Sequence, residues 1–249
     1  MRRKYVVQGV FWILVYLLLA SAPLLILLLG KMPEGREFWR EFSVALGFGG
    51  LALMSLQFVL TARFKSIKAP YGADIVYHFH RQISFVALAF ILAHPLLLFI
   101  FSPRTLALLK FYSAPWRARA GVTAVLLLLV LIGASLWRKR LKIEYTRWRI
   151  WHGILATAVM ALAITHVVLA RHYLNTPLKQ TLWIAYGLFW VGLLAYIRVL
   201  KPILLFRHPY EIESILPERG NAWSLTIQPV GHSGFKFMPG QFAWITVGN

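Results

Sequence analysis

The stretch HRQISFVALAFILAH, residues 80–94, begins and ends with histidine and encloses an apolar run of the kind that crosses a lipid bilayer. A second stretch, HGILATAVMALAITH, residues 152–166, repeats this pattern with the same spacing of 14 positions between its histidines. At about 100° and 1.5 Å per residue of α-helix, the spacing places both histidines of a stretch on one helix face, about 21 Å apart along the axis. The rest of the fold must therefore accommodate two apolar helices, each with a histidine near either end.

The composition is that of an integral membrane protein. The 249 residues are 59% hydrophobic and 14% charged, with a mean hydropathy of +0.65, whereas soluble domains have about 25% charged residues. Windows of about 20 apolar residues, the length that spans a bilayer, predict six membrane helices. They lie near residues 7–29, 41–61, 79–101, 119–137, 149–170 and 180–200. The first is expected to be a retained anchor, because its apolar run is too long for the core of a secretory signal.

The net charge of +19 follows the membrane topology and does not indicate a nucleic-acid partner, because Lys and Arg gather between the predicted helices. Residues 2–4, 63–68, 138–149 and 198–207 contain 15 of them, and residues 31–40, 104–119 and 171–179 on the opposite side contain 9. By the positive-inside rule both termini are cytoplasmic, and we expect a multi-pass protein of the plasma (cell inner) membrane.

Histidine is the one ionisable residue type that the apolar spans admit, and such a residue is a functional hypothesis by default. If the third and fifth helices run in the same direction, His80 lies level with His152, and His94 lies level with His166. Two imidazoles at one depth are suited to be the axial ligands of a haem iron. We therefore predict two haem b groups, an inner one on His80 and His152 and an outer one on His94 and His166.

Two alternatives use the same histidines differently. Imidazole also binds zinc and other transition metals, but the two levels are about 21 Å apart and neither offers the usual third and fourth protein ligands. A transporter could use the histidines as a proton relay, but relays usually combine histidine with buried carboxylates, and none is predicted here. The residues on the same helix stripes are mostly small, which would leave room for a flat macrocycle but is also typical of ordinary close helix packing. They are Ser84, Ala87, Ile91, Ala156, Val159 and Ala163.

Cationic side chains near the predicted membrane surfaces could bind haem propionates, which are anionic. The candidates are Arg81, Arg147, Arg149 and Arg171. His172, which follows Arg171, is a candidate contact for a propionate or for an electron acceptor. No residue is assigned a catalytic role.

After Pro202 the pattern changes to alternating apolar and polar residues, which indicates β-strands. Residues 204–249 would form three or four strands, too few for a stable barrel or sandwich. We therefore predict a helical membrane domain over residues 1–203 and an incomplete β-domain over residues 204–249.

The paired histidines on the third and fifth of six helices, followed by this strand region, resemble the ferric reductase and NADPH oxidase family. Residues 223–227 and the motif Pro239-Gly240-Gln241-Phe242 look like the opening strands of that family's flavin-binding barrel. The resemblance implies an all-α six-helix haem-binding membrane bundle, followed by the first strands of a ferredoxin reductase-type FAD barrel.

In that family, electrons pass from NAD(P)H through FAD, the inner haem and the outer haem to ferric iron or dioxygen. The family's flavin-contacting motif and its nicotinamide domain would follow Asn249, so the oxidoreductase activity is expected to need a C-terminal flavin and nicotinamide domain or a separate reductase. A haem-binding membrane subunit fed by quinol or by a separate flavoprotein is the alternative, but such subunits have no flavin barrel.

Overall fold

The computed structural model of the chain describes residues 2–62, 64, 71–235 and 245, and it divides the chain into two compact units. The first unit comprises Met1–Leu194 and the second Ala195–Asn249. Among the described residues, six helices are long and apolar enough to cross a membrane, which confirms the predicted number. They cover Tyr5–Leu28, Phe38–Thr61, Ala73–Phe101, Trp116–Leu136, Tyr145–Ala170 and Pro177–Phe206.

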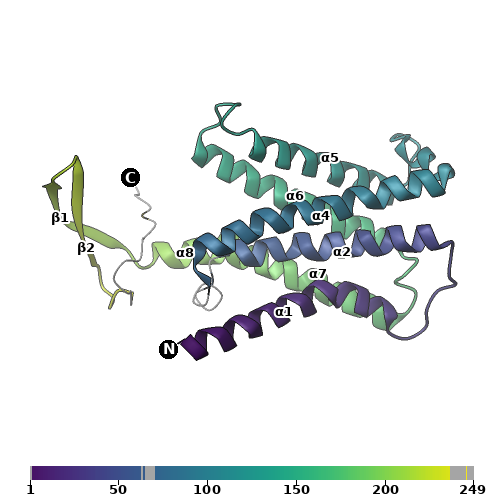
Figure 1. Cartoon of the computed structure of the whole chain (residues 1–249), viewed down its shortest axis with the longest axis horizontal. Helices are drawn as coiled ribbons and strands as arrows, with labels where there is room; N and C mark the ends of the chain where they lie inside the picture. The colour runs from purple at the N-terminus through teal and green to yellow at the C-terminus, as the bar shows by residue number, and fades with distance from the viewer. Residues whose placement is uncertain (1, 63, 65–70, 236–244, 246–249) are drawn as a thin grey trace. The chain divides into compact units, whose positions relative to one another are not determined.

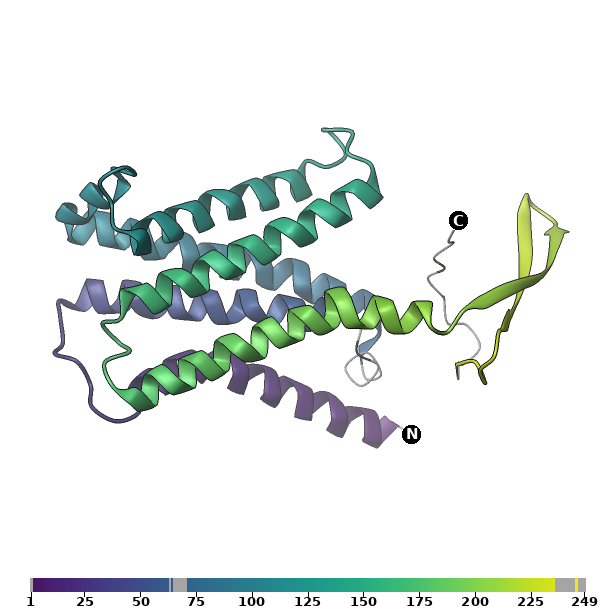
Figure 2. The ribbon, with the colours of Figure 1, turned by 180° about the vertical axis from the view of Figure 1, so that it is seen from behind.

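The first unit consists of helices joined by short connections (Figure 1). In chain order they are α1 (Arg2–Leu28), α2 (Phe38–Thr61), α4 (Ala73–Phe101), the short 3₁₀ helix η1 (Pro103–Leu109), α5 (Trp116–Leu136), α6 (Tyr145–Ala170) and α7 (Pro177–Ala195). α2 packs along α4, α5 packs along α6, and α1 packs on α2. Both views place α5 and α1 on opposite sides of the bundle (Figures 1 and 2).

The buried core of this unit lies where α1, α2, α6 and α7 meet. Half of the most apolar stretch of α2 is buried, against 6% of the corresponding stretch of α4. Most apolar side chains of the other spans remain exposed, as expected of surfaces that contact lipid. The core residues are Leu27, Phe48, Leu51, Leu56, Phe58, Met160, Leu174, Trp183 and Trp190.

The start of α6 is fixed by Glu144, which precedes the helix. One carboxylate oxygen accepts a hydrogen bond from the Thr146 amide at 2.7 Å and the other from the Arg147 amide at 2.8 Å. These bonds satisfy two of the amides that a helix N-terminus leaves unpaired, and they lower the pKa of Glu144. This cap sets where α6 begins, and therefore how far His152 lies from the start of the helix.

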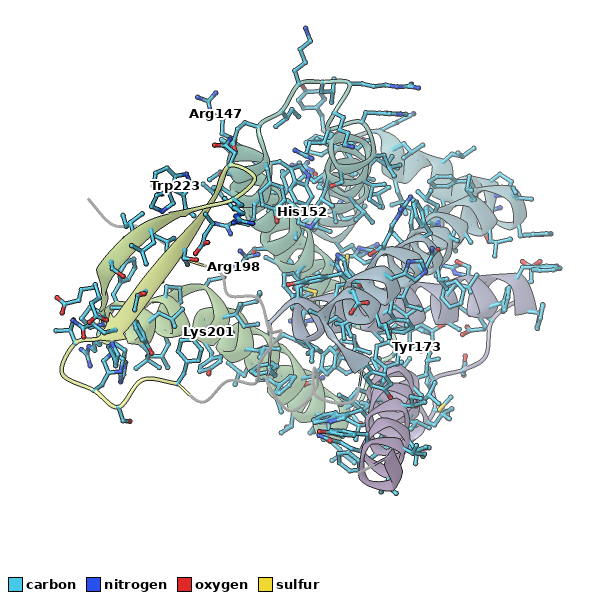
Figure 3. The ribbon with its side chains drawn as sticks, turned by 60° about the vertical axis from the view of Figure 1, so that its left-hand side comes forward. Arg147, His152, Tyr173, Arg198, Lys201 and Trp223 are labelled. Carbon is cyan, nitrogen blue, oxygen red and sulfur yellow. The ribbon has the colours of Figure 1, made fainter. Side chains whose placement is uncertain are left out.

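The second unit contains the π-helix η2 (Tyr196–Leu200), α8 (Lys201–Phe206) and an antiparallel hairpin of β1 (Tyr210–Glu218) and β2 (Ala222–Pro229). The helix continues past Pro202, because proline is tolerated in the first turn of α8. The strands therefore begin later than the alternating pattern predicted. The residues of both strands are mostly exposed, including Trp223 (Figure 3). The motif Pro239-Gly240-Gln241-Phe242 lies outside the described residues.

Candidate functional site

The rings of His94 on α4 and His166 on α6 face each other. Their centroids are 6.3 Å apart, and the ring planes are inclined at 68°. Two metal–nitrogen bonds of about 2 Å each fit within that separation. The structure therefore brings this predicted pair together at a distance that one metal atom could bridge.

The hydrogen bonds of this pair fix which ring nitrogen carries the proton. His94 Nδ1 lies 2.9 Å from the Ser43 carbonyl oxygen, and His166 Nδ1 lies 2.7 Å from the Arg117 carbonyl oxygen. A carbonyl oxygen can only accept, so Nδ1 must be the donor in both rings. Each ring thus keeps the Nε2 lone pair, which is the state that ligates a metal.

His152, near the start of α6, has the same tautomer for a different reason. The Ser135 hydroxyl donates to the Leu131 carbonyl at 2.7 Å and accepts from Trp148 Nε1 at 3.2 Å. The hydroxyl hydrogen is thus engaged, so the 3.1 Å contact between Ser135 Oγ and His152 Nδ1 requires Nδ1 to donate. Three of the four predicted ligands therefore donate through Nδ1.

His80 on α4 lies within electrostatic range of His152, its predicted partner. Its Nδ1 atom is buried and has no hydrogen-bond partner among the residues that the structure describes. A buried polar atom without a partner is costly and calls for an explanation. A bound polar or charged group beside the ring would provide one.

Two glycines allow the rings of the His94–His166 pair to lie against helix backbones. A Cβ atom on Gly47 of α2 would lie 3.2 Å from His94 Cγ, and one on Gly121 of α5 would lie 2.8 Å from His166 Nδ1. Together with the free Nε2 atoms, these cradles suit a flat cofactor that takes one imidazole on each side, as a haem does.

The small residues on the histidine stripe of α4 pack against α2 and do not line an open gap. A Cβ on Gly50 would lie 2.7 Å from Ile91 Cγ1 and 3.4 Å from the Ala87 carbonyl oxygen, and Ser84 lies 3.4 Å from Gln57. For these three residues the contacts favour the alternative expectation, ordinary close helix packing. Small side chains here allow close approach of two helices.

The predicted propionate partners lie in exposed positions near the helix ends. Arg81 is on α4, Arg147 and Arg149 are in the first turns of α6, and Arg171 follows its last residue. Arg171 has a positive φ of 54° and ends the helix in a left-handed conformation. None of the four takes part in an ion pair among the described residues.

His172 follows the C-terminal end of α6, the end far from His152, and belongs to a polar cluster there. Figure 3 labels His152 and, in the cluster, Tyr173. Arg36 pairs with Glu41 at 3.0 Å and donates to the Tyr173 hydroxyl at 2.6 Å, and that hydroxyl donates to Glu41. Burial, with the bond to Glu41, raises the pKa of Tyr173 to about 12. Burial and the Arg36 guanidinium lower the pKa of His172, whose ring packs on Tyr173.

A small apolar cavity of about 140 Å³ lies beside His152 between α5 and α6. The lining residues are Leu131, Ala134, Ile143, Trp148, Trp151, His152 and Leu155. Among the described residues, no group of three or more His, Cys, Asp or Glu side chains could hold a metal ion. The facing imidazoles of His94 and His166 are thus a two-ligand donor set, and the surroundings of His152 are apolar.

Sequence reasoning missed the residues that support the histidines: Ser43, Gly47, Gly121 and Ser135. Each lies on a different helix from the histidine that it contacts, so the periodicity of one helix cannot reveal the contact. A signal was nevertheless present, because Ser43, Gly47 and Gly50 follow one another at helical spacing in a span of larger apolar residues.

Comparison with known proteins agrees with this geometry. Residues 46–164, which contain three of the four histidines, match the family described as ferric reductase like transmembrane component. An uncharacterized protein of Archaeoglobus fulgidus is 32% identical over 130 residues, which cover 48% of this chain and 70% of the relative. No solved structure is significantly similar. Residues 46–164 are therefore a ferric reductase-like transmembrane domain, a family that indicates electron transfer in a membrane.

Proposed function

We propose that the chain conducts electrons across a membrane through two b-type haems, from a cytoplasmic flavin and nicotinamide donor to ferric iron or dioxygen on the outer face. The observation that carries the proposal is the state of His94 and His166. Both rings commit Nδ1–H to a backbone carbonyl, both keep Nε2 free, and their centroids are 6.3 Å apart. These are the requirements for two axial ligands of one iron.

His80 and His152 are the proposed ligands of the inner haem, and His94 and His166 those of the outer haem. Each haem, when bound, would supply a one-electron carrier whose potential depends on its ligands and their hydrogen bonds. The chain orients the imidazoles and surrounds them with apolar helices. Because the two histidines of a pair would occupy both axial positions, an acceptor must take its electron without binding the iron.

The remaining parts of the proposal concern the residues at the ends of the membrane spans. Arg81, Arg147, Arg149 and Arg171, with His172, are the proposed contacts of the propionates or of the acceptor, because cations stabilise carboxylates near a membrane surface. The Lys and Arg distribution supports cytoplasmic termini, and the proposed location is the plasma membrane. FAD and NAD(P)H would bind further domains or a separate reductase, with residues 239–242 as the start of the flavin barrel.

The test is the haem content of purified protein after haem-supplemented expression. We expect two haems per chain by pyridine haemochrome assay and low-spin b-type bands in the reduced minus oxidised spectrum. His94→Ala and His166→Ala should each remove the outer haem alone, and His80→Ala and His152→Ala the inner haem alone, because a lost axial ligand cannot be replaced by an apolar neighbour.

His78→Ala is the matched control, because His78 lies on the same helix but is exposed. It should retain both haems. A wild-type chain that binds no haem would refute the proposed function. A folded, monodisperse ligand variant with the full haem content would refute that ligand assignment.

A further inference from the structure

Two serine hydroxyls, on α2 and α5, contact one proposed ligand in each pair. Ser43 is fully buried; its hydroxyl donates to the His94 carbonyl at 2.9 Å and lies 3.1 Å from His94 Nδ1. On α5, Ser135 Oγ accepts from His152 Nδ1 at 3.1 Å. The two pairs thus receive support of the same kind from different helices.

The presence of these hydroxyls, one fully buried and one half-buried within apolar spans, needs a physical reason. A hydroxyl in an apolar environment costs free energy unless it is hydrogen-bonded, and an alanine at either position would avoid that cost. Ser43 holds both the backbone and the ring of His94, and Ser135 is held by Leu131 and Trp148 while it contacts His152. These hydrogen bonds therefore serve to orient the imidazole rings of His94 and His152.

An acceptor on Nδ1–H affects a metal ligand in two ways. It fixes the rotation of the ring, and it makes the imidazole more electron-rich, which stabilises the oxidised metal. Removal of the acceptor should therefore raise the reduction potential of the iron that the ring ligates. For His94 the Ser43 carbonyl remains as an acceptor, so loss of the hydroxyl should shift the potential without loss of the tautomer.

We propose that Ser43 and Ser135 are positioning residues that tune the two redox centres separately, Ser43 the outer haem through His94 and Ser135 the inner haem through His152. This inference rests on the proposed function, because it needs both haems. It goes beyond ligand assignment, since it assigns to each haem one serine hydroxyl that affects its reduction potential.

The test is a potentiometric titration of the full chain, followed by optical spectra and by electron paramagnetic resonance of the oxidised protein. Ser43→Ala should raise the midpoint potential of the outer haem and alter its resonance signal, with the inner haem unchanged. Ser135→Ala should do the reverse. The signals are assigned to the two haems with the His94→Ala and His152→Ala variants. Ser43→Thr and Ser135→Thr keep a hydroxyl and should restore the wild-type potentials.

Ser55→Ala is the matched control. Ser55 lies on α2, is as fully buried as Ser43, and donates to the Leu51 carbonyl at 2.8 Å, with Met160 and Tyr186 as its other partners. Its replacement should change neither potential. If Ser43→Ala does not fold, Ser135→Ala decides the outcome. Variants that bind two haems but leave both potentials unchanged, or shift both equally, would overturn the inference, whereas a wild-type chain without haem would overturn the proposed function itself.

Discussion

At the scale of single residues, the site depends on two glycines, Gly47 and Gly121, which have no side chain. Gly121 and Gly47 let the rings of His166 and His94 lie directly on helix backbones. The approach is tighter at Gly121, where a Cβ would lie 2.8 Å from His166 Nδ1 and would compete with the 2.7 Å bond to the Arg117 carbonyl. Gly121 is therefore the more sensitive position.

We predict that Gly121→Ala lowers the affinity for the outer haem by about 10-fold or more, the range found when the partner of a metal ligand is lost. The methyl group would push the His166 ring off its carbonyl acceptor. Haem retained per chain during dilution or competition with apomyoglobin measures the effect. Gly192→Ala is the control, because a Cβ there would meet nothing within 4 Å; equal haem loss in both variants would contradict the role of Gly121.

The shared helix face of the paired histidines follows from the sequence, but the residues that contact them do not. A spacing of 14 residues places two side chains on one face of a helix whatever the helix packs against. The contacts of Ser43 and Gly121 depend on which helix lies beside which, and they join residues that are far apart in the chain. Hydropathy gives the length of a span but not its neighbours.

At the scale of elements, the cluster of Arg36, Glu41 and Tyr173 fastens the start of α2 to the connection between α6 and α7. The Tyr173 ring also packs on Phe48 in the core, with centroids 6.0 Å apart. Since Glu41 lies two positions before Ser43, the cluster holds the part of α2 that contacts His94.

We predict that Tyr173→Phe destabilises this end of the bundle by about 1.5 kcal/mol, the contribution of a hydrogen bond to a charged group. For a unit of this size, that corresponds to a decrease of about 3–6 °C in the melting temperature. Thermal unfolding in detergent measures it. Tyr112→Phe serves as control, because Tyr112 is 96% exposed; an equal decrease in both variants would show that the hydroxyl of Tyr173 is not the cause.

The same residue predicts a pH dependence. Because the pKa of Tyr173 is raised from 10.0 to about 12, folding favours the neutral phenol. Its contribution to stability is complete below pH 10 and disappears as the pH rises toward 12. The difference in melting temperature between wild type and Tyr173→Phe should therefore be constant from pH 7 to 9 and shrink above pH 10. A difference that grows with pH would contradict this assignment.

At the scale of the whole molecule, the helices of the first unit pack mainly as pairs, α2 with α4 and α5 with α6, with fewer contacts between α2 and α6. The paired histidines lie on α4 and α6, one helix from each pair. Groups ligated by both helices would therefore link the two pairs. Ligand binding to the folded state alone also raises its stability by mass action.

We predict that protein from haem-deficient cells melts at a lower temperature than the haem-loaded protein and that added haem restores the difference. The variant in which all four of His80, His94, His152 and His166 are alanine should show no rise with haem. A rise in that variant would indicate haem binding elsewhere, for example to detergent-exposed surfaces.

The six spans were predicted correctly because bilayer thickness imposes their length directly on the sequence. The pairing of strands in the second unit could not be predicted, because alternation identifies strands but not their partners. Two strands are described, and their period-two pattern leaves apolar residues exposed on the hairpin. Neither the predicted boundary at residue 203 nor the flavin barrel is tested by these strands, and both stay predictions.

The carbonyl acceptors of His94 and His166 have a consequence for charge balance. An imidazole passes a proton on only if it gains one at one nitrogen and releases one from the other, and here Nδ1–H points at a helix carbonyl that cannot receive it. On the proposed function, an electron would therefore cross without a proton relayed by these two imidazoles. Such transfer is electrogenic, and a membrane potential of 100 mV would change its driving force by about 2.3 kcal/mol per electron.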